Sequence, residues 1–101
     1  MAYHCTRFTW DEAKDALNRR KHGLSFDEAR ELFASDVRSI EIFDARNSVT
    51  EDRFISIGPI GRGPVLVAWT ELDDGVVRII SARRATRREA SRYRKLNGDE
   101  R

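Results

Sequence analysis

The first third of the chain has the polar and apolar spacing of two short helices. Thr9 and Glu12 have the spacing of a capping box, and Gly23 is suited to the left-handed position after a helix end. Ser25 and Glu28 form a second such pair, followed by apolar residues on one helix face at Phe26, Ala29, Leu32 and Phe33. The pattern predicts one helix over residues 10–22 and another from residue 26 to about residue 34.

The middle of the chain changes to runs rich in valine and isoleucine, which are typical of strands. These runs cover residues 39–43, 53–57, 65–70 and 76–82. A glycine-rich loop at residues 58–64 and a hairpin signal at Asp73-Asp74-Gly75 separate the later runs. The order predicts an antiparallel meander of four strands, and the pattern is compatible with a short first strand at residues 7–9.

A third capping box at Thr86 and Glu89 opens a terminal helix with Ala90 and Tyr93 on one side, ending at Asn97-Gly98. Residues 1–101 are therefore expected to form a single α+β domain with two N-terminal helices, a four-stranded antiparallel sheet and a C-terminal helix. Simple alternation along the last strand predicts two mixed faces. One carries Arg78, Ile80, Ala82 and Arg84, and the other carries Ile79, Ser81 and Arg83.

Composition limits the classes of protein that fit. No apolar run approaches the roughly 18 residues that cross a bilayer, and the N-terminus lacks the apolar core of a signal peptide. Cys5 is the single cysteine, so neither an intramolecular disulfide nor a site with several thiolates can form. We expect a cytoplasmic protein without a membrane partner.

The charge is distributed unevenly along the chain. Residues 1–52 hold 8 basic and 11 acidic residues, a net charge of −3, whereas residues 53–101 hold 11 and 6, a net charge of +5. Arginine accounts for 16 of the 19 basic residues, and its planar guanidinium donates bidentate hydrogen bonds to phosphate. This bias favours an anionic partner. A merely solvated surface, or a genome whose codons favour arginine, is the alternative.

The densest basic run begins at the end of the last predicted strand and continues through the terminal helix. It contains Arg83, Arg84, Arg87, Arg88, Arg92, Arg94 and Lys95, opposed within that span by Glu89. Arg87 and Arg88 fall in the first helical turn, where positive charge opposes the macrodipole. Stability alone would select against them, so the run favours phosphate or nucleic-acid binding over a solvated helix face.

Few other residues suggest chemistry. His22 has a side chain that can exchange protons near neutral pH, although its place in the last turn before Gly23 slightly favours a structural role. Arginines inside strands, such as Arg53 and Arg78, are either functional or paired with a carboxylate such as Asp52 or Glu71. The sequence contains no metal-binding histidine pair, nucleotide phosphate loop or nucleophile elbow, so we expect neither a metal nor a cofactor.

Taken together, the chain resembles the BrnT family of toxins, which are ribonuclease components of bacterial type II toxin–antitoxin pairs. The resemblance covers almost the whole chain and rests on the order and spacing of several short motifs. These are Phe8-Thr9-Trp10-Asp11 with Lys14, Asn18, Lys21-His22-Gly23-Leu24-Ser25-Phe26 with Glu28-Ala29, Glu51-Asp52-Arg53-Phe54 with Ile57-Gly58, the stretch from Arg78 to Ala85, Glu89 and Tyr93.

The resemblance implies a RelE-like fold and RNA cleavage without a metal, in which the ribose 2′-OH attacks the adjacent phosphorus. It also implies a cognate DNA-binding, BrnA-like antitoxin that covers the toxin, so that any contact with DNA is indirect. The expected catalytic residues are Arg53, Arg78 and Arg83 as a phosphate clamp, with Lys21, His22 or Tyr93 in proton transfer or positioning. The expected RNA-binding residues are Arg62, Arg84, Arg87, Arg88 and Arg92.

Two other functions use the same basic surface. A non-catalytic module would bind RNA in a salt-sensitive manner and leave it intact. A pure interaction protein would use its basic helix to bind an acidic partner in the absence of nucleic acid.

Overall fold

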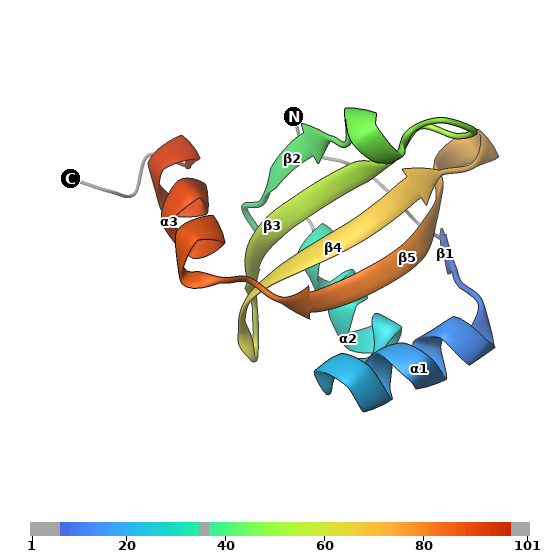
Figure 1. Ribbon diagram of the computed structural model, residues 1–101, viewed down its shortest axis with the longest axis horizontal. Coiled ribbons are helices and arrows are strands. Elements are labelled where there is room, and N and C mark those ends of the chain that lie inside the picture. The colour runs from blue at the N-terminus through green and yellow to red at the C-terminus, as the bar shows by residue number, and fades with distance from the viewer. Residues whose placement is uncertain (1–6, 35–36, 98–101) are drawn as a thin grey trace.

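The computed structural model describes residues 7–34 and 37–97 and shows an α+β fold (Figure 1). Helices α1 and α2 cover one face of a five-stranded sheet, and helix α3 packs at one end of the opposite face (Figure 1). The elements are β1 (Arg7–Thr9), α1 (Glu12–His22), α2 (Phe26–Ala29), the 3₁₀ turn η1 (Arg30–Phe33), β2 (Ile40–Phe43), η2 (Ala45–Asn47), β3 (Phe54–Ile60), β4 (Gly63–Glu71), η3 (Asp73–Gly75), β5 (Val76–Arg84) and α3 (Arg87–Leu96).

The sheet is mixed, with the strand order β1-β5-β4-β3-β2. Strands β2 to β5 form the expected antiparallel meander, but β1 pairs with β5 in parallel, with Phe8 beside Val77. The prediction of an exclusively antiparallel, four-stranded sheet is therefore wrong, and the expected RelE-like layout is not fully matched. The short strand at residues 7–9 is present because Phe8 packs with the core on the helix-covered face.

Helix α1 begins two residues later than expected. Its N-cap is Asp11, whose Oδ1 accepts hydrogen bonds from the backbone N–H groups of Ala13 at 2.8 Å and Lys14 at 3.1 Å. Thr9 is not the cap because it belongs to β1. At the other end Gly23 has φ of 69° and donates its N–H to the Arg19 carbonyl, which confirms the predicted helix stop.

The other two predicted capping boxes, at Ser25 with Glu28 and at Thr86 with Glu89, are both present. The second predicted helix, however, is α-helical only over α2 and continues as η1, so its last turn is tighter than expected. Asn97 caps α3 as predicted. Gly98 and Cys5 lie outside the described residues.

The predicted loop at residues 58–64 is mostly strand. β3 and β4 pair as far as Ile60 with Gly63, leaving a turn at Gly61 and Arg62. Gly63 has φ of 109°, a conformation that favours glycine. The glycines and prolines of this segment predict the position of the turn correctly, but the turn is shorter than predicted. Gly58 serves packing, since a Cβ there would lie 2.8 Å from Leu32 Cδ1.

The main core lies between the sheet and helices α1 and α2. Trp69, Phe26 and Ile79 are almost completely buried there, and Trp69 Nε1 donates a hydrogen bond to Ser56 Oγ at 2.8 Å. Asn18 ties α1 to this layer. Its Nδ2 donates to the carbonyls of Leu24 and Ala82, both at 2.8 Å, and its Oδ1 accepts the Ala82 N–H at 3.2 Å.

A shift in the register of β4 and β5, between Ala68 and Trp69, changes which side chains of β5 share a face. Trp69 pairs with Ile79 but Ala68 pairs with Ser81, so β5 has one extra residue there. Directly paired residues of an antiparallel ladder point to the same side. Arg78, Ser81 and Arg83, the partners of Thr70, Ala68 and Leu66, therefore share one face. The predicted alternation is wrong beyond this bulge, since Arg84 and Ala82 lie on the face that carries Val65 and Val67.

Helix α3 covers only part of the second face. Tyr93 and Ala90 are its buried residues, and Tyr93 packs with Ile57 and Leu66. The helix lies at one end of the sheet, while the broad middle of β4 and β5 carries no helix on that side (Figure 1). We call this part of the sheet, with Ala68, Thr70, Arg78 and Ser81, the open face. Ser81 is exposed there, Ala68 and Arg78 are partly exposed, and Thr70 is buried, with 2% exposure.

Candidate functional site

Two arginines lie on either side of Thr70 of β4: Arg78 belongs to β5, and Arg53 immediately precedes β3. Thr70 pairs with Arg78, and its Oγ1 donates to the carbonyl of Asp52 at 2.6 Å. The β3–β4 ladder ends where Phe54 pairs with Trp69, and continuing its register by one residue places Arg53, which precedes β3, beside Thr70. We call Arg53, Thr70 and Arg78 the arginine row. Because neighbouring strands are about 4.8 Å apart, the row places two guanidinium groups around one short side chain.

Arg53 is the more enclosed member of the row. Its Nε is buried and has no hydrogen-bond partner among the described residues, although Glu51 Oε2 lies 3.4 Å away. That distance is an ion-pair contact without the geometry of a hydrogen bond. A buried donor left unpaired costs about 1–3 kcal/mol, so the arrangement is better suited to a bound acceptor than to the protein alone.

Arg78, by contrast, is partly exposed on β5. Its side chain forms no hydrogen bond or ion pair with any residue of the ranges 7–34 and 37–97. The alternative interpretation, in which a strand arginine pairs with Asp52 or Glu71, therefore does not hold for Arg78. Its full set of guanidinium donors is available to a ligand on the open face.

Arg83 lies on the same side of the sheet but is held by α3. Its Nη1 and Nη2 donate to the two carboxylate oxygens of Glu89 at 2.8 and 2.9 Å. Hydrogen bonding from Arg83, ahead of the backbone bond from Thr86, lowers the pKa of Glu89 to about 2, and the same pair raises the pKa of Arg83. Arg83 is thus fixed in position, and its Nε–H remains without a partner in the described part of the chain.

The three residues predicted for proton transfer do not face the arginine row. Tyr93 packs between α3 and the sheet, on Ile57 and Leu66, and its Oη donates to the Arg38 carbonyl at 2.6 Å and accepts from Asn97 Nδ2 at 3.3 Å. Lys21 and His22 are exposed in the last turn of α1, which packs against the opposite face of the sheet. The structure therefore does not bring these three together with Arg53 and Arg78.

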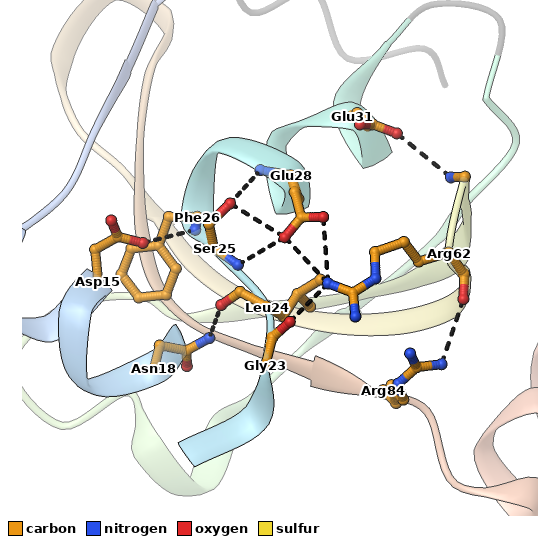
Figure 2. A network of polar contacts seen from close by, with 11 residues as sticks. Asp15, Asn18, Gly23, Leu24, Ser25, Phe26, Glu28, Glu31, Arg62 and Arg84 are labelled. Carbon is orange, nitrogen blue, oxygen red and sulfur yellow. Dashed lines mark hydrogen bonds and ion pairs between the residues drawn. The ribbon is translucent and has the colours of Figure 1, made fainter. Parts of the chain in front are cut away.

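A second basic group lies on that opposite side, at the tip of the β3–β4 hairpin (Figure 2). Arg62 Nη1 donates to the Gly23 carbonyl at 2.6 Å and contacts both carboxylate oxygens of Glu28. Arg84 Nη1 in turn donates to the Arg62 carbonyl at 3.4 Å. The Ser25 backbone, followed by Arg62, lowers the pKa of Glu28. Arg62 thus has a structural role whether or not it binds RNA.

The remaining predicted RNA-binding residues, Arg87, Arg88 and Arg92, are exposed on α3. With Ser91 and Lys95 they line a surface hollow of about 610 Å³. They point away from the buried side of the helix that carries Ala90 and Tyr93.

Sequence reasoning missed several polar residues of the site. Thr70 lies outside the motifs of the family resemblance, whereas Glu51 and Ser81 lie within them without an expected role. The strand register that puts Ser81 on the same face as Arg78 depends on the bulge. The sequence pattern indicates Glu89 only as a capping residue, although it also holds Arg83. No helix within the described ranges is long and apolar enough to span a membrane. The same ranges contain no group of three metal-ligating side chains.

Comparisons with known proteins identify the family of this chain. A family described as the ribonuclease toxin, BrnT, of type II toxin–antitoxin systems matches residues 10–89. The 1.1 Å crystal structure of the Brucella abortus ribonuclease toxin BrnT is similar, with a TM-score of 0.60 and 25% sequence identity, over 81% of this chain and 100% of that chain. No curated protein sequence matches. The match over residues 10–89 includes every strand of the sheet except β1, and the chain belongs to the BrnT family of ribonuclease toxins of type II toxin–antitoxin systems.

Proposed function

We propose that this chain is a metal-independent endoribonuclease that binds the scissile phosphate of RNA at the arginine row. The observation that carries the proposal is the pair of guanidinium groups at Arg53 and Arg78, which flank Thr70 on a face without a covering helix. Within the described ranges, neither Arg53 Nε nor any guanidinium donor of Arg78 has a hydrogen-bond partner.

Arginine is suited to this task because it keeps its charge at every physiological pH and donates along a planar fork. Two such groups on opposite sides of a phosphate would neutralise the charge that builds on its non-bridging oxygens in the transition state. A metal ion can supply the same stabilisation in other nucleases, so the row offers an alternative to it.

The reaction follows from the chemistry of RNA. The ribose 2′-oxygen forms a bond to the adjacent phosphorus, a pentacoordinate phosphorane develops, and the bond from phosphorus to the 5′-oxygen breaks. The products are a 2′,3′-cyclic phosphate and a free 5′-hydroxyl, so the proton lost by the 2′-OH is balanced by the one gained at the 5′-oxygen. DNA lacks the 2′-OH and is not a substrate.

A carboxylate beside the row can accept the proton of the 2′-OH. Glu51 Oε2 lies 3.4 Å from Arg53 Nε, so a phosphate bound by Arg53 would bring its flanking ribose close to this group. We assign Glu51 as the general base. Participation of Lys21, His22 or Tyr93 stays a prediction, and the clamp does not depend on it.

Membership of a toxin–antitoxin family implies an antitoxin partner. We further propose that this antitoxin is a DNA-binding, BrnA-like protein, that the toxin reaches DNA only through it, and that the toxin acts on RNA in the cytoplasm.

The test is cleavage of a labelled RNA by the purified chain in the presence of EDTA. Arg53→Ala and Arg78→Ala should each slow cleavage at least about 100-fold, as removal of an oxyanion donor does elsewhere. Arg30→Ala is the matched control, because Arg30 pairs with Asp27 on α2, on the other side of the sheet. Thermal unfolding of each variant separates loss of function from loss of fold.

Undiminished cleavage in both row variants would overturn the clamp. Loss of cleavage in EDTA with recovery on adding a divalent metal would overturn metal independence. Salt-sensitive binding of RNA that stays intact would favour the non-catalytic module instead.

A further inference from the structure

One side of α3 carries a concentrated positive charge around a hollow. Arg88 and Arg92 are four residues apart and Lys95 follows three residues later, so all three share one helix face with Ser91. Together with Arg87 these residues line the hollow of about 610 Å³. Ser91 is the short side chain among long ones, which leaves space between the basic groups and places a hydroxyl donor there.

The four basic residues of this hollow have no acidic counterpart in the part of the chain that the structure describes. Elsewhere arginines pair readily, as Arg30 does with Asp27 and Arg62 with Glu28. Arg87, Arg88, Arg92 and Lys95 form no ion pair within residues 7–34 and 37–97. Like charges four residues apart destabilise a helix, and Arg87 and Arg88 also oppose its dipole. The arrangement costs stability unless an anion binds.

The composition and shape of the hollow indicate which anion. Its lining residues are three arginines, a lysine and a serine, whose cationic groups stand at the ends of apolar side-chain stems. A protein interface has an apolar core, whereas this lining is suited to phosphate oxygens. The hollow is formed on a single helix and does not enclose its contents, so a small ligand would not be buried as in a typical pocket. An extended chain of phosphates suits it better.

The position of the hollow connects it to the open face. Arg83, at the end of the open face, is bound to Glu89, which lies on α3 between Arg88 and Ser91. A strand of RNA that leaves the arginine row toward α3 would pass Arg83 and then meet the hollow. We propose that the α3 hollow binds phosphates that flank the scissile phosphate in the same RNA strand. The hollow is formed by Arg87, Arg88, Ser91, Arg92 and Lys95.

This inference rests on the proposed function for the identity of its ligand, but binding can be measured without cleavage. The probe is a single-stranded RNA carrying 2′-O-methyl groups throughout, which leaves no 2′-OH to attack. Arg88→Ala combined with Arg92→Ala should weaken binding of this probe about 10-fold or more at low salt. The slope of log affinity against log salt should fall by about 0.7 for each phosphate that the variant no longer neutralises.

Arg94→Ala combined with Arg20→Ala is the matched control. Both arginines are exposed helix residues outside the lining of the hollow, so the control removes the same charge. The test variant should fold at least as well as the parent, because alanine favours helix and Arg88→Ala removes a charge that opposes the dipole. A lower affinity then reports the removal of phosphate-binding groups rather than unfolding.

Equal affinity and equal salt slope in the test and control variants would overturn the inference. So would a variant that binds the probe normally but no longer binds its antitoxin, since the hollow would then be a protein-docking surface. If the parent cleaves no unmodified RNA but the double variant still loses affinity for the probe, the proposed function fails and the hollow stands. On cleavable RNA the double variant should raise KM with kcat retained, because the hollow lies away from the reacting phosphate.

Discussion

Arg83 and Glu89 form a bidentate pair in which Nη1 donates to Oε1 at 2.8 Å and Nη2 donates to Oε2 at 2.9 Å. The same Oε1 accepts the backbone N–H of Thr86 at 2.8 Å. One carboxylate thus closes the capping box of α3 and fastens that helix to the end of β5. Because α3 buries only Ala90 and Tyr93, this pair is a main determinant of where the helix lies.

Glu89→Gln should destabilise the protein in a pH-dependent manner. The amide keeps an acceptor for Thr86 but loses the charge that holds Arg83. The pKa of Glu89 falls from 4.5 to about 2 on folding, so its charge stabilises the folded state above about pH 4.5 and this contribution is lost as the pH falls toward 2. Partial exposure reduces the effect at pH 7 to about 1–2 kcal/mol.

Urea unfolding of parent and variant at several pH values measures this difference. It should be largest near neutral pH and shrink steadily below about pH 4.5. A difference of equal size at pH 7 and pH 2.5 would show that the amide disturbs packing and that the ion pair contributes little.

The elements that could be predicted from sequence are those set by local interactions. The capping boxes at Ser25 with Glu28 and Thr86 with Glu89 involve residues three positions apart, so the sequence contains all the information. The start of α1 is ambiguous from sequence because Thr9 and Asp11 are both good caps. Thr9 of β1 pairs with Arg78 of β5, an interaction between residues distant in sequence. This pairing keeps Thr9 in the strand and leaves Asp11 as the N-cap of α1.

The candidate site is less predictable because it depends on register. The sequence indicates Arg53 and Arg78 by residue type, but nothing local shows that both stand beside Thr70. Strict alternation separates Arg78 from Arg83, and only the bulge between Ala68 and Trp69 returns them to one face. Pairing between strands therefore determines the site, and single-sequence patterns do not encode it.

Asn18→Ala should be strongly destabilising although Asn18 is polar. The side chain is buried and makes three hydrogen bonds, which join α1 to the Leu24 carbonyl and to the backbone of Ala82 in β5. Alanine would leave buried backbone groups unpaired, at a cost of about 3 kcal/mol. Chemical denaturation checks this, with Asn47→Ala as control because the Asn47 amide bonds Asp44 at an exposed site. Equal effects of the two substitutions would contradict the prediction.

Ser81→Glu should weaken RNA binding while leaving the fold intact. Ser81 is exposed on the open face, between the positions of Arg78 and Arg83 along β5. A carboxylate there would repel phosphate and offer both arginines an internal partner, which should lower affinity at least about 10-fold. Ala13→Glu adds the same charge at an exposed site on α1 and should bind RNA as the parent does. Normal binding by Ser81→Glu would place the RNA elsewhere than the open face.

Arg62→Ala separates a structural from an RNA-binding role at the hairpin tip. Arg62 Nη1 donates to the Gly23 carbonyl at 2.6 Å and pairs with Glu28 at 3.2 Å, so it joins the β3–β4 turn to the corner between α1 and α2 (Figure 2). Both side chains are substantially exposed, which limits the loss of stability to about 1 kcal/mol.

Because Arg62 Nη1 is already bound to Gly23 and Glu28, the same substitution should change RNA affinity less than Arg53→Ala does. Arg46→Ala, an exposed arginine of η2, controls for the loss of one charge. Thermal unfolding and RNA binding, measured on the same samples, distinguish the structural role from the RNA-binding role. A lower unfolding temperature with RNA affinity close to that of Arg46→Ala indicates a structural role, whereas a large loss of affinity with unchanged stability would mean that Arg62 exchanges Glu28 for phosphate when RNA binds.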